Sequence, residues 1–242
     1  MKKINCLSLI TARSGSKGLK NKNIKKIGGK TLIEFKLMAI NKARIKNNFI
    51  VVSTESKKYI NILKRKKINY IKRPEALAKD NTESKPVIIH AINQLKKIGK
   101  QFDHIILLEP ATPFSSFKDI KKAYKIFLNK NLDLIASIEE TSVHSNFISS
   151  LNNKSLKHML KKMSKIKKYR RQSFEKEFKM DGGFYIFKLE SLFKFEKLFD
   201  YRFKSEGFIV DKKRAINIEN LNDFNIAKCY YKNFSEISDS FK

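Results

Sequence analysis

Apolar residues gather in short runs along the chain, and the runs alternate between two spacings. The run at residues 4–12 is almost continuous, which is typical of a buried strand, whereas the run at 87–98 has apolar residues three and four apart, which is typical of a helix. By these criteria strands are expected at residues 4–12, 49–54, 68–71, 104–108, 134–138 and 182–189. Helices are expected at residues 32–40, 59–66, 87–98, 120–128 and 220–231, the fourth capped by Ser116 with Asp119 three residues on.

The order of these segments predicts the fold class. Strands alternate with helices through short links, which favours an α/β fold of three layers, with a mostly parallel sheet covered by helices on both faces. The pattern stops near residue 141, and the stretch from 141 to 180 is polar and rich in Lys. We therefore expect one α/β domain built from residues 1–140 and 181–242, with an arm or small subdomain at 141–180.

Composition and charge narrow the function classes. The chain has 242 residues, of which 41% are hydrophobic, enough to bury a core. Its net charge of +30 raises the question of nucleic acid, but Lys is spread over nearly every segment, and the densest basic run, 161–171, contains one aromatic residue, Tyr169. We expect no specific nucleic-acid binding, although such a field would attract an anionic substrate.

Targeting segments and metal motifs are also not indicated. No run approaches the ~18 apolar residues that span a bilayer, and the stretch at 4–12 lacks a signal-peptide cleavage site. We expect a cytoplasmic protein without a membrane partner. Cys6 and Cys229 stand outside any zinc-ligand spacing, and both are expected to pack as small core residues.

The loop after the first strand carries the first candidate chemistry. It reads Ala12-Arg-Ser-Gly-Ser-Lys-Gly18. Glycines let backbone N–H groups approach an anion closely, Arg13 offers a planar fork to phosphate oxygens, and Lys17 adds a compact charge. Standard nucleotide motifs are missing, because Ile24 stands where a Walker A would need Gly, and there is no G-x-G-x-x-G. The residues of this predicted triphosphate cradle are Ala12, Arg13, Ser14, Gly15, Ser16 and Lys17.

This loop, with Asn21-Lys-Asn23-Ile and Gly28-Gly-Lys30 after it, resembles the opening signature of the acylneuraminate cytidylyltransferases. A plain Gly/Ser turn beside basic surface residues is the alternative, but further segments match in the right order over residues 4 to 231. The resemblance implies a nucleotide-diphospho-sugar transferase-like fold. It also implies that CTP is joined to an acidic nine-carbon sugar of the sialic, legionaminic or pseudaminic type, with release of pyrophosphate. A homodimer formed through the arm is implied as well.

A second segment resembles the family's nucleotide-binding signature. It runs Arg73-Pro-Glu-Ala-Leu-Ala-Lys-Asp80-Asn-Thr-Glu-Ser84. The resemblance implies that Arg73 and Ser84 reach the nucleotide together with Asn23, although Ser84 is equally consistent with a helix N-cap. It assigns the catalytic charges to Arg13 and Lys17.

Two later segments resemble the sugar side of the family's site. The family's strand-end segment L-Q-P-T-S-P-L-R appears here with Glu109 in place of Gln and Ser115 in place of Arg. A carboxylate in place of an amide at position 109 reverses the preference for a nearby anionic or hydroxylated group. The acceptor sugar therefore need not be the commonest sialic acid. The residues that the resemblance assigns to the sugar are Glu109, Thr112, Arg171, Asp181 and Tyr185. Arg171 alone is equally consistent with a surface residue in a basic stretch.

The segment Ala215-Ile-Asn217-Ile-Glu219 resembles the family's D-I-D metal strand. Side chains two apart on a strand point the same way, so Asn217 and Glu219 are expected to face one Mg²⁺. The ion accepts oxygen ligands and leans on substrate phosphates, so the site could survive the loss of one carboxylate, held more weakly. The alternative is that this segment binds no metal.

Three rival functions stay open on the sequence alone. A cytidylyltransferase for Kdo is the near neighbour, and the R-P-E-x-L-A-x-D-N-T and R-Q segments argue against it. A degenerate, non-catalytic binding protein is suggested by the altered metal pair, and the intact Arg13–Lys17 loop argues against it. A nucleic-acid-binding module is suggested only by the charge.

Overall fold

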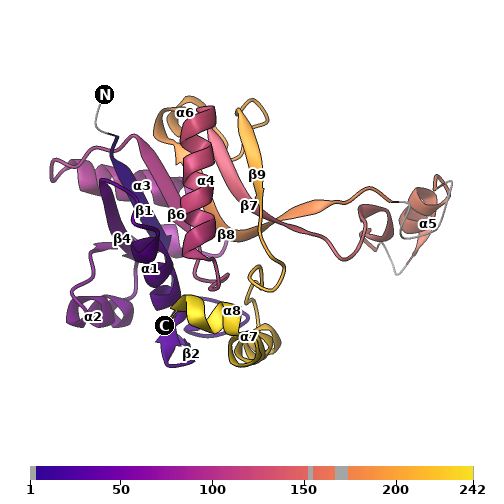
Figure 1. Cartoon of the computed structure of the whole chain (residues 1–242), viewed down its shortest axis with the longest axis horizontal. Coiled ribbons are helices and arrows are strands. Elements are labelled where there is room, and N and C mark those ends of the chain that lie inside the picture. The colour runs from indigo at the N-terminus through magenta and orange to yellow at the C-terminus, as the bar shows by residue number, and fades with distance from the viewer. Residues whose placement is uncertain (1–3, 152–154, 167–173, 242) are drawn as a thin grey trace.

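The computed structural model describes residues 4–151, 155–166 and 174–241. Within this part of the chain a seven-stranded sheet has the order β5-β4-β1-β6-β8-β7-β9, and a two-stranded ribbon, β2-β3, lies apart from it (Figure 1). The strands are β1 (Cys6–Thr11), β2 (Lys26–Ile27), β3 (Lys30–Thr31), β4 (Asn48–Thr54), β5 (Tyr70–Lys72), β6 (His104–Leu108), β7 (Leu134–Glu140), β8 (Phe178–Lys188) and β9 (Ser205–Ile209). In the large sheet only β8 runs antiparallel to its neighbours.

Helices cover both faces of the sheet, as the alternating pattern predicts. The α-helices are α1 (Leu32–Ala43), α2 (Lys57–Arg65), α3 (Ser84–Lys96), α4 (Phe117–Lys130), α5 (Lys157–Met163), α6 (Leu189–Lys194), α7 (Leu221–Asn233) and α8 (Ser235–Ser238). Short 3₁₀ turns stand at Lys22–Ile24, Glu75–Ala78, Ser145–Phe147 and Asp239–Phe241. One core lies between the sheet and α1, α2, α4, α7 and α8, and a second lies between the sheet and α3 and α6.

The central strand β1 shows why the strands read as continuous apolar runs. Leu7 and Leu9 pack into the core beneath α3, whereas Cys6 and Ile10 pack into the opposite core. Because successive side chains point to opposite faces, a strand covered on both sides is apolar at nearly every position. The exception in β1 is the buried Ser8, whose hydroxyl donates to the Asn48 side chain (2.8 Å). The three-layer fold expected from the sequence is confirmed.

Several local expectations differ from the structure. The sequence pattern missed β9, α6 and the small ribbon, and β8 begins at Phe178 rather than at 182. Ser116 does cap α4 by accepting from the Lys118 N–H (3.2 Å), but Asp119 forms an ion pair with Arg214 (2.9 Å) instead of completing a capping box. Cys6 is buried, whereas Cys229 is exposed rather than part of the core.

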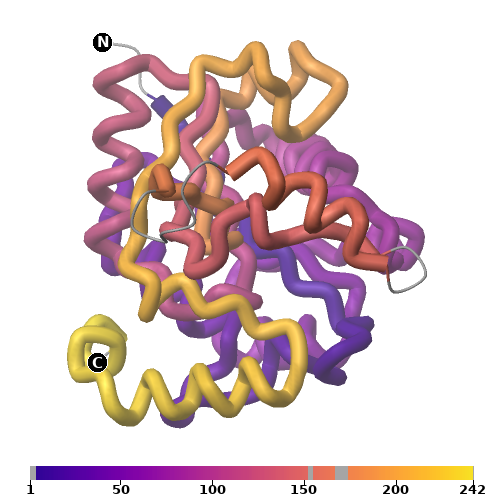
Figure 2. Tube along the Cα trace, turned by 90° about the vertical axis from the view of Figure 1, so that its right-hand side faces the viewer, coloured from indigo at the N-terminus to yellow at the C-terminus, as the bar shows by residue number. Residues whose placement is uncertain are grey.

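The segment after β7 projects from the body of the molecule. Figure 1 shows α5 and its neighbours at the end of this projection, and Figure 2 shows the projection from its tip, in front of the sheet. At its base the Thr141 N–H donates to the Glu177 carbonyl (2.8 Å), so the β7–β8 ribbon continues outward. Apolar side chains are exposed along it, among them Ile148 (56% exposed) and Leu160 (57% exposed).

A search of the helices within residues 4–151, 155–166 and 174–241 finds none that combines the length and the apolarity needed to cross a lipid bilayer.

Candidate active site

A cleft of about 480 Å³ opens at the carboxyl ends of β1 and β6. Open α/β sheets bind ligands at this edge, because the βα loops and helix N-termini converge there. The cleft collects residues from segments that are far apart in the sequence: the loop after β1, the segment after β5, the start of α3, the end of β6 and the segment before α7. The sequence-predicted residues in its walls are Arg13, Ser16, Lys17, Asn23, Arg73, Ser84, Glu109 and Glu219.

The loop after β1 is held in place by its neighbours. The Asn23 amide donates to the Arg13 carbonyl (2.8 Å), which fixes the loop against the 3₁₀ turn. A Cβ on Gly18 would lie 2.3 Å from the Glu219 carbonyl oxygen, so only glycine permits this close approach of the loop to the segment before α7. Ala12, Ser14 and Gly15 belong to the same loop but do not line the cleft.

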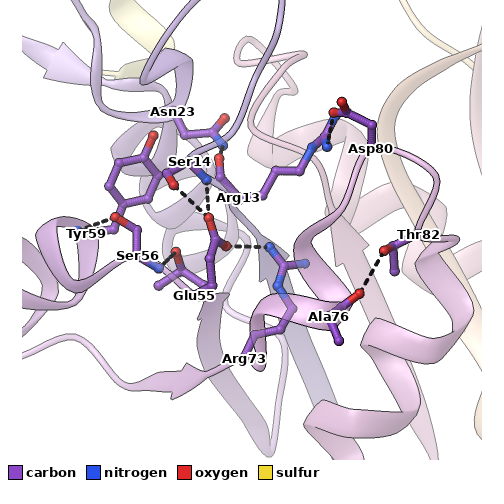
Figure 3. A network of polar contacts seen from close by, with 11 residues as sticks. Arg13, Ser14, Asn23, Glu55, Ser56, Tyr59, Arg73, Ala76, Asp80 and Thr82 are labelled. Carbon is purple, nitrogen blue, oxygen red and sulfur yellow. Dashed lines mark hydrogen bonds and ion pairs between the residues drawn. The ribbon is translucent and has the colours of Figure 1, made fainter.

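Glu55 organises the floor beneath this loop, and the sequence analysis missed it. Its carboxylate accepts from the Ser14 N–H (2.6 Å), from the Ser14 hydroxyl (2.8 Å) and from the Arg73 guanidinium (3.2 Å), as Figure 3 shows. Burial alone raises the pKa of Glu55, but the hydrogen bonds from Ser14 and Arg73 outweigh it and lower the pKa below the ordinary value. The only sequence signal was an acidic residue directly after a predicted strand.

Arg73 lies in the wall of the cleft with 4% of its surface exposed. Its Nε atom is buried and has no hydrogen-bond partner among the described residues. A buried guanidinium N–H without a partner is costly, and a bound ligand is one way to satisfy it. Ser84 is the first residue of α3, at the helix start that the motif predicts, and the N-cap is Glu83, so the alternative of a Ser84 N-cap is not observed.

Two cations of the loop share one carboxylate. Asp80 accepts from Arg13 (2.5 Å) and from Lys17 (2.7 Å), and the side chains of Arg13 and Asp80 are more than a third exposed. The hydrogen bond from Lys17 and, to a smaller extent, the one from Arg13 lower the pKa of Asp80. The carboxylate marks a position in the cleft that favours an anion, on the far side of Arg13 from the Glu55 network in Figure 3. Asp80 belongs to the second sequence signature, Arg73 to Ser84, but the sequence analysis assigned it no role.

A second group of predicted residues lies beside the cleft. The Thr112 hydroxyl donates to the Asp181 carbonyl (2.8 Å), and Asp181 accepts from the Ser137 hydroxyl. Glu109 lines the cleft, and burial raises its pKa against the opposing effect of Lys36 and Lys22.

The same neighbourhood includes Tyr185, which is 7% exposed. Burial raises its pKa, and the charges of Glu109 and Asp181 add to the effect. The structure therefore brings together four of the five predicted sugar residues, and Arg171 lies outside the described residues.

Lys36 lies behind this second group and was missed by the sequence analysis. It is fully buried on α1, and its ammonium group donates to the Ser115 hydroxyl (2.6 Å) and to the Gly183 carbonyl (2.8 Å). Burial lowers the pKa of Lys36 to about 7, although Asp181 and Glu109 oppose the shift. The helical spacing of Leu32, Lys36 and Ile40 placed this lysine on an apolar face, which was a usable signal.

The predicted metal pair lies in an irregular segment, so the expectation of a strand at 215–219 is wrong. The two side chains are nevertheless adjacent, because the Asn217 amide donates to the Glu219 carboxylate (3.2 Å). One carboxylate and one amide oxygen are donors that Mg²⁺ accepts when substrate phosphates complete its shell. In residues 4–151, 155–166 and 174–241 no cluster of three or more His, Cys, Asp and Glu is found.

Lys22 also lines the cleft and was missed as a site residue. Its ammonium group donates to the Ile218 carbonyl (2.6 Å), which ties the first loop to the candidate metal segment. Burial lowers the pKa of Lys22, while Glu219 and Glu109 oppose that change. Another positive charge therefore lies close to where phosphates would bind.

The sheet order, the basic cleft at the strand ends and the carboxylate cluster beside it define a nucleotide-binding transferase of the α/β class. The chain belongs to the cytidylyltransferase family, whose model matches residues 7–235, and it is therefore a nucleotidyltransferase, as its sequence indicated.

Relatives agree with the family assignment, and a solved structure shares the fold. The chain is 32% identical to post-translational flagellin modification protein B of Campylobacter coli, covering 93% of this chain and 94% of that protein. It is also 32% identical to CMP-N,N'-diacetyllegionaminic acid synthase of Campylobacter jejuni, covering 92% and 93% of the two chains. The structure of CMP:2-keto-3-deoxy-manno-octonic acid synthetase complexed with CTP has the same fold, with a TM-score of 0.67, 12% identity and coverage of 94% and 98%.

Proposed function

We propose that this enzyme joins CTP to a nine-carbon 2-keto-3-deoxy sugar acid of the sialic, legionaminic or pseudaminic type, giving the CMP-sugar and pyrophosphate. The observation that carries the proposal is the anion position between Arg13 and Lys17, at the strand ends and beside the carboxylate cluster of Glu109 and Asp181. The legionaminic acid synthase among its relatives, similar over nearly the whole chain, supports the sugar class.

The transfer step follows from the charges in the cleft. The anomeric hydroxyl oxygen of the sugar loses its proton to solvent and forms a bond to the α-phosphorus of CTP, and the bond from that phosphorus to the bridging oxygen breaks, releasing pyrophosphate. Catalysis of such a step is chiefly positioning and charge stabilisation. Arg13 and Lys17 bind the triphosphate, Lys17 neutralises the leaving pyrophosphate, and Lys22 adds a third cation. Residues assigned to the nucleotide are Asn23, Arg73 and Ser84.

Asn217 and Glu219 would hold Mg²⁺, and Glu219 lies in the cleft wall that faces the first loop. A bound Mg²⁺ would supply neutralisation of phosphate charge. On the acceptor side, the Glu109 carboxylate accepts hydrogen bonds, so it favours a sugar that presents a hydroxyl or amide N–H there. Thr112, Asp181 and Tyr185 complete this side, and Arg171 is assigned to the carboxylate of the sugar.

The proposal includes a cytoplasmic homodimer formed through the projecting segment. Its support is the row of exposed apolar side chains there, including Ile148 and Leu160, which a partner subunit would cover.

The test is pyrophosphate release from CTP and Mg²⁺ with a panel of nine-carbon keto acids and Kdo. Release with one nine-carbon acid is the expected result. Release with Kdo alone would show instead that the enzyme is a cytidylyltransferase for Kdo. An Asn217→Asp variant that turns over faster would show that the altered metal pair limits the rate. CTP binding without release on any sugar would indicate a non-catalytic homologue.

A further inference from the structure

Lys36 occupies an unfavourable place for a charge. Phe35 and Leu37 beside it on α1 are buried in the core, and the lysine itself has no exposed surface. Burying an ammonium group costs several kcal/mol unless it is paired and hydrogen-bonded. A methionine would fill the same volume without that cost, so packing does not account for a lysine at this position.

The contacts of Lys36 lead directly to the acceptor side of the cleft. Its ammonium group donates to the Gly183 carbonyl (2.8 Å), and the Gly183 N–H donates to Asp181 (3.2 Å), so both polar groups of this glycine are engaged. A Cβ on the preceding Gly182 would lie 3.1 Å from the Glu109 carboxylate. The Gly182–Gly183 segment of β8 therefore contacts Lys36 and lies next to both carboxylates.

This segment is an irregular part of strand β8. Gly182 has a φ of +76°, and the β7–β8 ladder shifts register between Ala136 and Ile138, beside Asp181. Irregularities of this kind re-aim side chains near functional sites, and they need surrounding contacts to persist. The second hydrogen bond of Lys36, to the Ser115 hydroxyl (2.6 Å), anchors the lysine from the segment after β6.

We infer that Lys36 is a positioning residue for the acceptor sugar: its buried ammonium group fixes the Gly182–Gly183 segment of β8 and balances the negative charge of Glu109 and Asp181. This inference rests on the proposed function, since it concerns the acceptor side of the same site. With its charge balanced by Lys36, the Glu109 carboxylate accepts a hydrogen bond from a hydroxyl or amide N–H of the sugar. An acceptor without a donor at that position is rejected.

Electrostatics agree with the geometry. The groups that act on Glu109 are Lys36, Lys22 and Asp181: the two lysines lower its pKa, and Asp181 raises it together with burial. The effect is mutual, because burial lowers the pKa of Lys36 to about 7 while the charges of Asp181 and Glu109 oppose that shift. Without the charge of Lys36, burial and Asp181 raise the pKa of Glu109, and of the two lysines only Lys22 is left to lower it.

The test compares Lys36→Met with a matched control, Lys42→Met, on the same helix but bonded to the Ser240 carbonyl outside the site. In Lys36→Met the acceptor KM should rise by about 5-fold or more, whereas the Kd for CTP stays within about 2-fold. The acidic limb of the kcat/KM profile should move upward by about one pH unit. In a Glu109→Gln background, Lys36→Met should change the acceptor KM by less than about 2-fold, because the charge it balances is gone.

A second measurement needs no substrate. In protein labelled with ¹³C-glutamate, the Glu109 carboxyl, assigned by its loss in Glu109→Gln, should titrate higher in Lys36→Met than in the wild type. If Lys36→Met does not fold, Ser115→Ala removes one of the two acceptors of Lys36 and should shift the same titration in the same direction by less.

Failures of the two proposals are distinguishable. Wild-type enzyme without pyrophosphate release on any sugar would overturn the proposed function, and the NMR titration would still decide whether Lys36 acts on Glu109. An unchanged Glu109 titration, an additive double variant, or a shifted titration with an unchanged acceptor KM would each overturn the positioning role.

Discussion

At the scale of single residues, the partners of a charged side chain are set by the residues that surround it in the fold more than by its position in a sequence motif. Asp80 follows Arg73 in one signature, yet in the fold its carboxylate lies between Arg13 and Lys17. Glu55 stands in no motif and supports the loop from below. Replacing Asp80 should change CTP binding, and replacing Glu55 should change the stability of the fold.

Asp80 competes with an incoming anion for the two cations of the loop. We predict that Asp80→Asn binds CTP about 2- to 5-fold more tightly, because exposed ion pairs of this kind are worth little each and their loss frees both cations. Isothermal titration calorimetry measures the change. Glu190→Gln, an exposed carboxylate on α6, serves as the control and should bind CTP as the wild type does. Weaker binding in Asp80→Asn would mean that Asp80 organises the cations for the nucleotide.

Glu55 links the loop to Arg73, so its loss should destabilise the fold. We predict that Glu55→Gln lowers the free energy of unfolding by about 1–3 kcal/mol at pH 7, since charged hydrogen bonds are lost at a largely buried position. The pKa of Glu55 is lowered in the folded protein, so its stabilisation is present above the ordinary value of 4.5 and is lost as pH falls through the lowered pKa.

Urea denaturation at pH 7 and pH 3.5 would check this. The difference between wild type and Glu55→Gln should narrow at the lower pH, and a difference that widened on acidification would contradict the assignment of the lowered pKa.

At the scale of elements, the site depends on close packing between segments that the sequence separates widely. The loop after β1 touches the segment before α7 through Gly18 and Lys22, although about two hundred residues lie between them. The final helices lie at the same end of the molecule as β2 in Figure 1, where a Cβ on Gly28 would meet the Tyr231 ring. The effect of replacing a glycine here therefore depends on how closely another segment approaches it.

Two glycines of one loop make a matched pair. We predict that Gly18→Ala lowers the free energy of unfolding by about 1–3 kcal/mol, because its Cβ would lie 2.3 Å from the Glu219 carbonyl and backbone must move. Gly15→Ala, whose Cβ meets nothing within 4 Å, should change the free energy of unfolding by less than about 0.5 kcal/mol. Chemical denaturation of both variants is the measurement, and equal effects would rule out the close approach as the cause.

At the scale of the whole molecule, a compact sheet domain carries a projection with exposed apolar residues and a net charge of +30. The like charges on two copies oppose their association, so an apolar contact is needed to hold a dimer together. Exposed apolar side chains also occur on the body, but a series of them follows along the projecting segment: Val143, Ile148, Leu151, Leu156 and Leu160.

The proposed dimer is tested by charge insertion. We predict that the double variant Ile148→Asp and Leu160→Asp shifts the protein from dimer to monomer in analytical ultracentrifugation, because two carboxylates would be buried at the contact. Ile98→Asp, at a position 67% exposed on the body, should leave the wild-type sedimentation unchanged. A wild type that sediments as a monomer at every concentration would contradict the dimer.

The sequence by itself determined the layers of this protein and the family to which it belongs. Apolar periodicity predicts β1, β4, β6, α1 and α3, because elements buried in such a fold are apolar at nearly every position or along one side. The Arg13–Lys17 loop predicts a phosphate-binding site from local chemistry alone. The elements β9, α6 and the β2–β3 ribbon escaped for local reasons. The ribbon strands have two residues each, β9 has apolar side chains only at Phe208 and Ile209, and α6 spans six residues, too few to show a helical period.

Only the tertiary structure decided which charges work together. Lys36 is one lysine among many in the sequence, and its burial against Ser115 and Gly183 appears only when α1, β6 and β8 pack together. Glu55 and Lys22 likewise gain their partners from segments that are distant in the chain. The physical reason is that pKa shifts and hydrogen bonds depend on burial and on distances of a few ångströms, and these are set by packing between elements rather than by spacing along the chain.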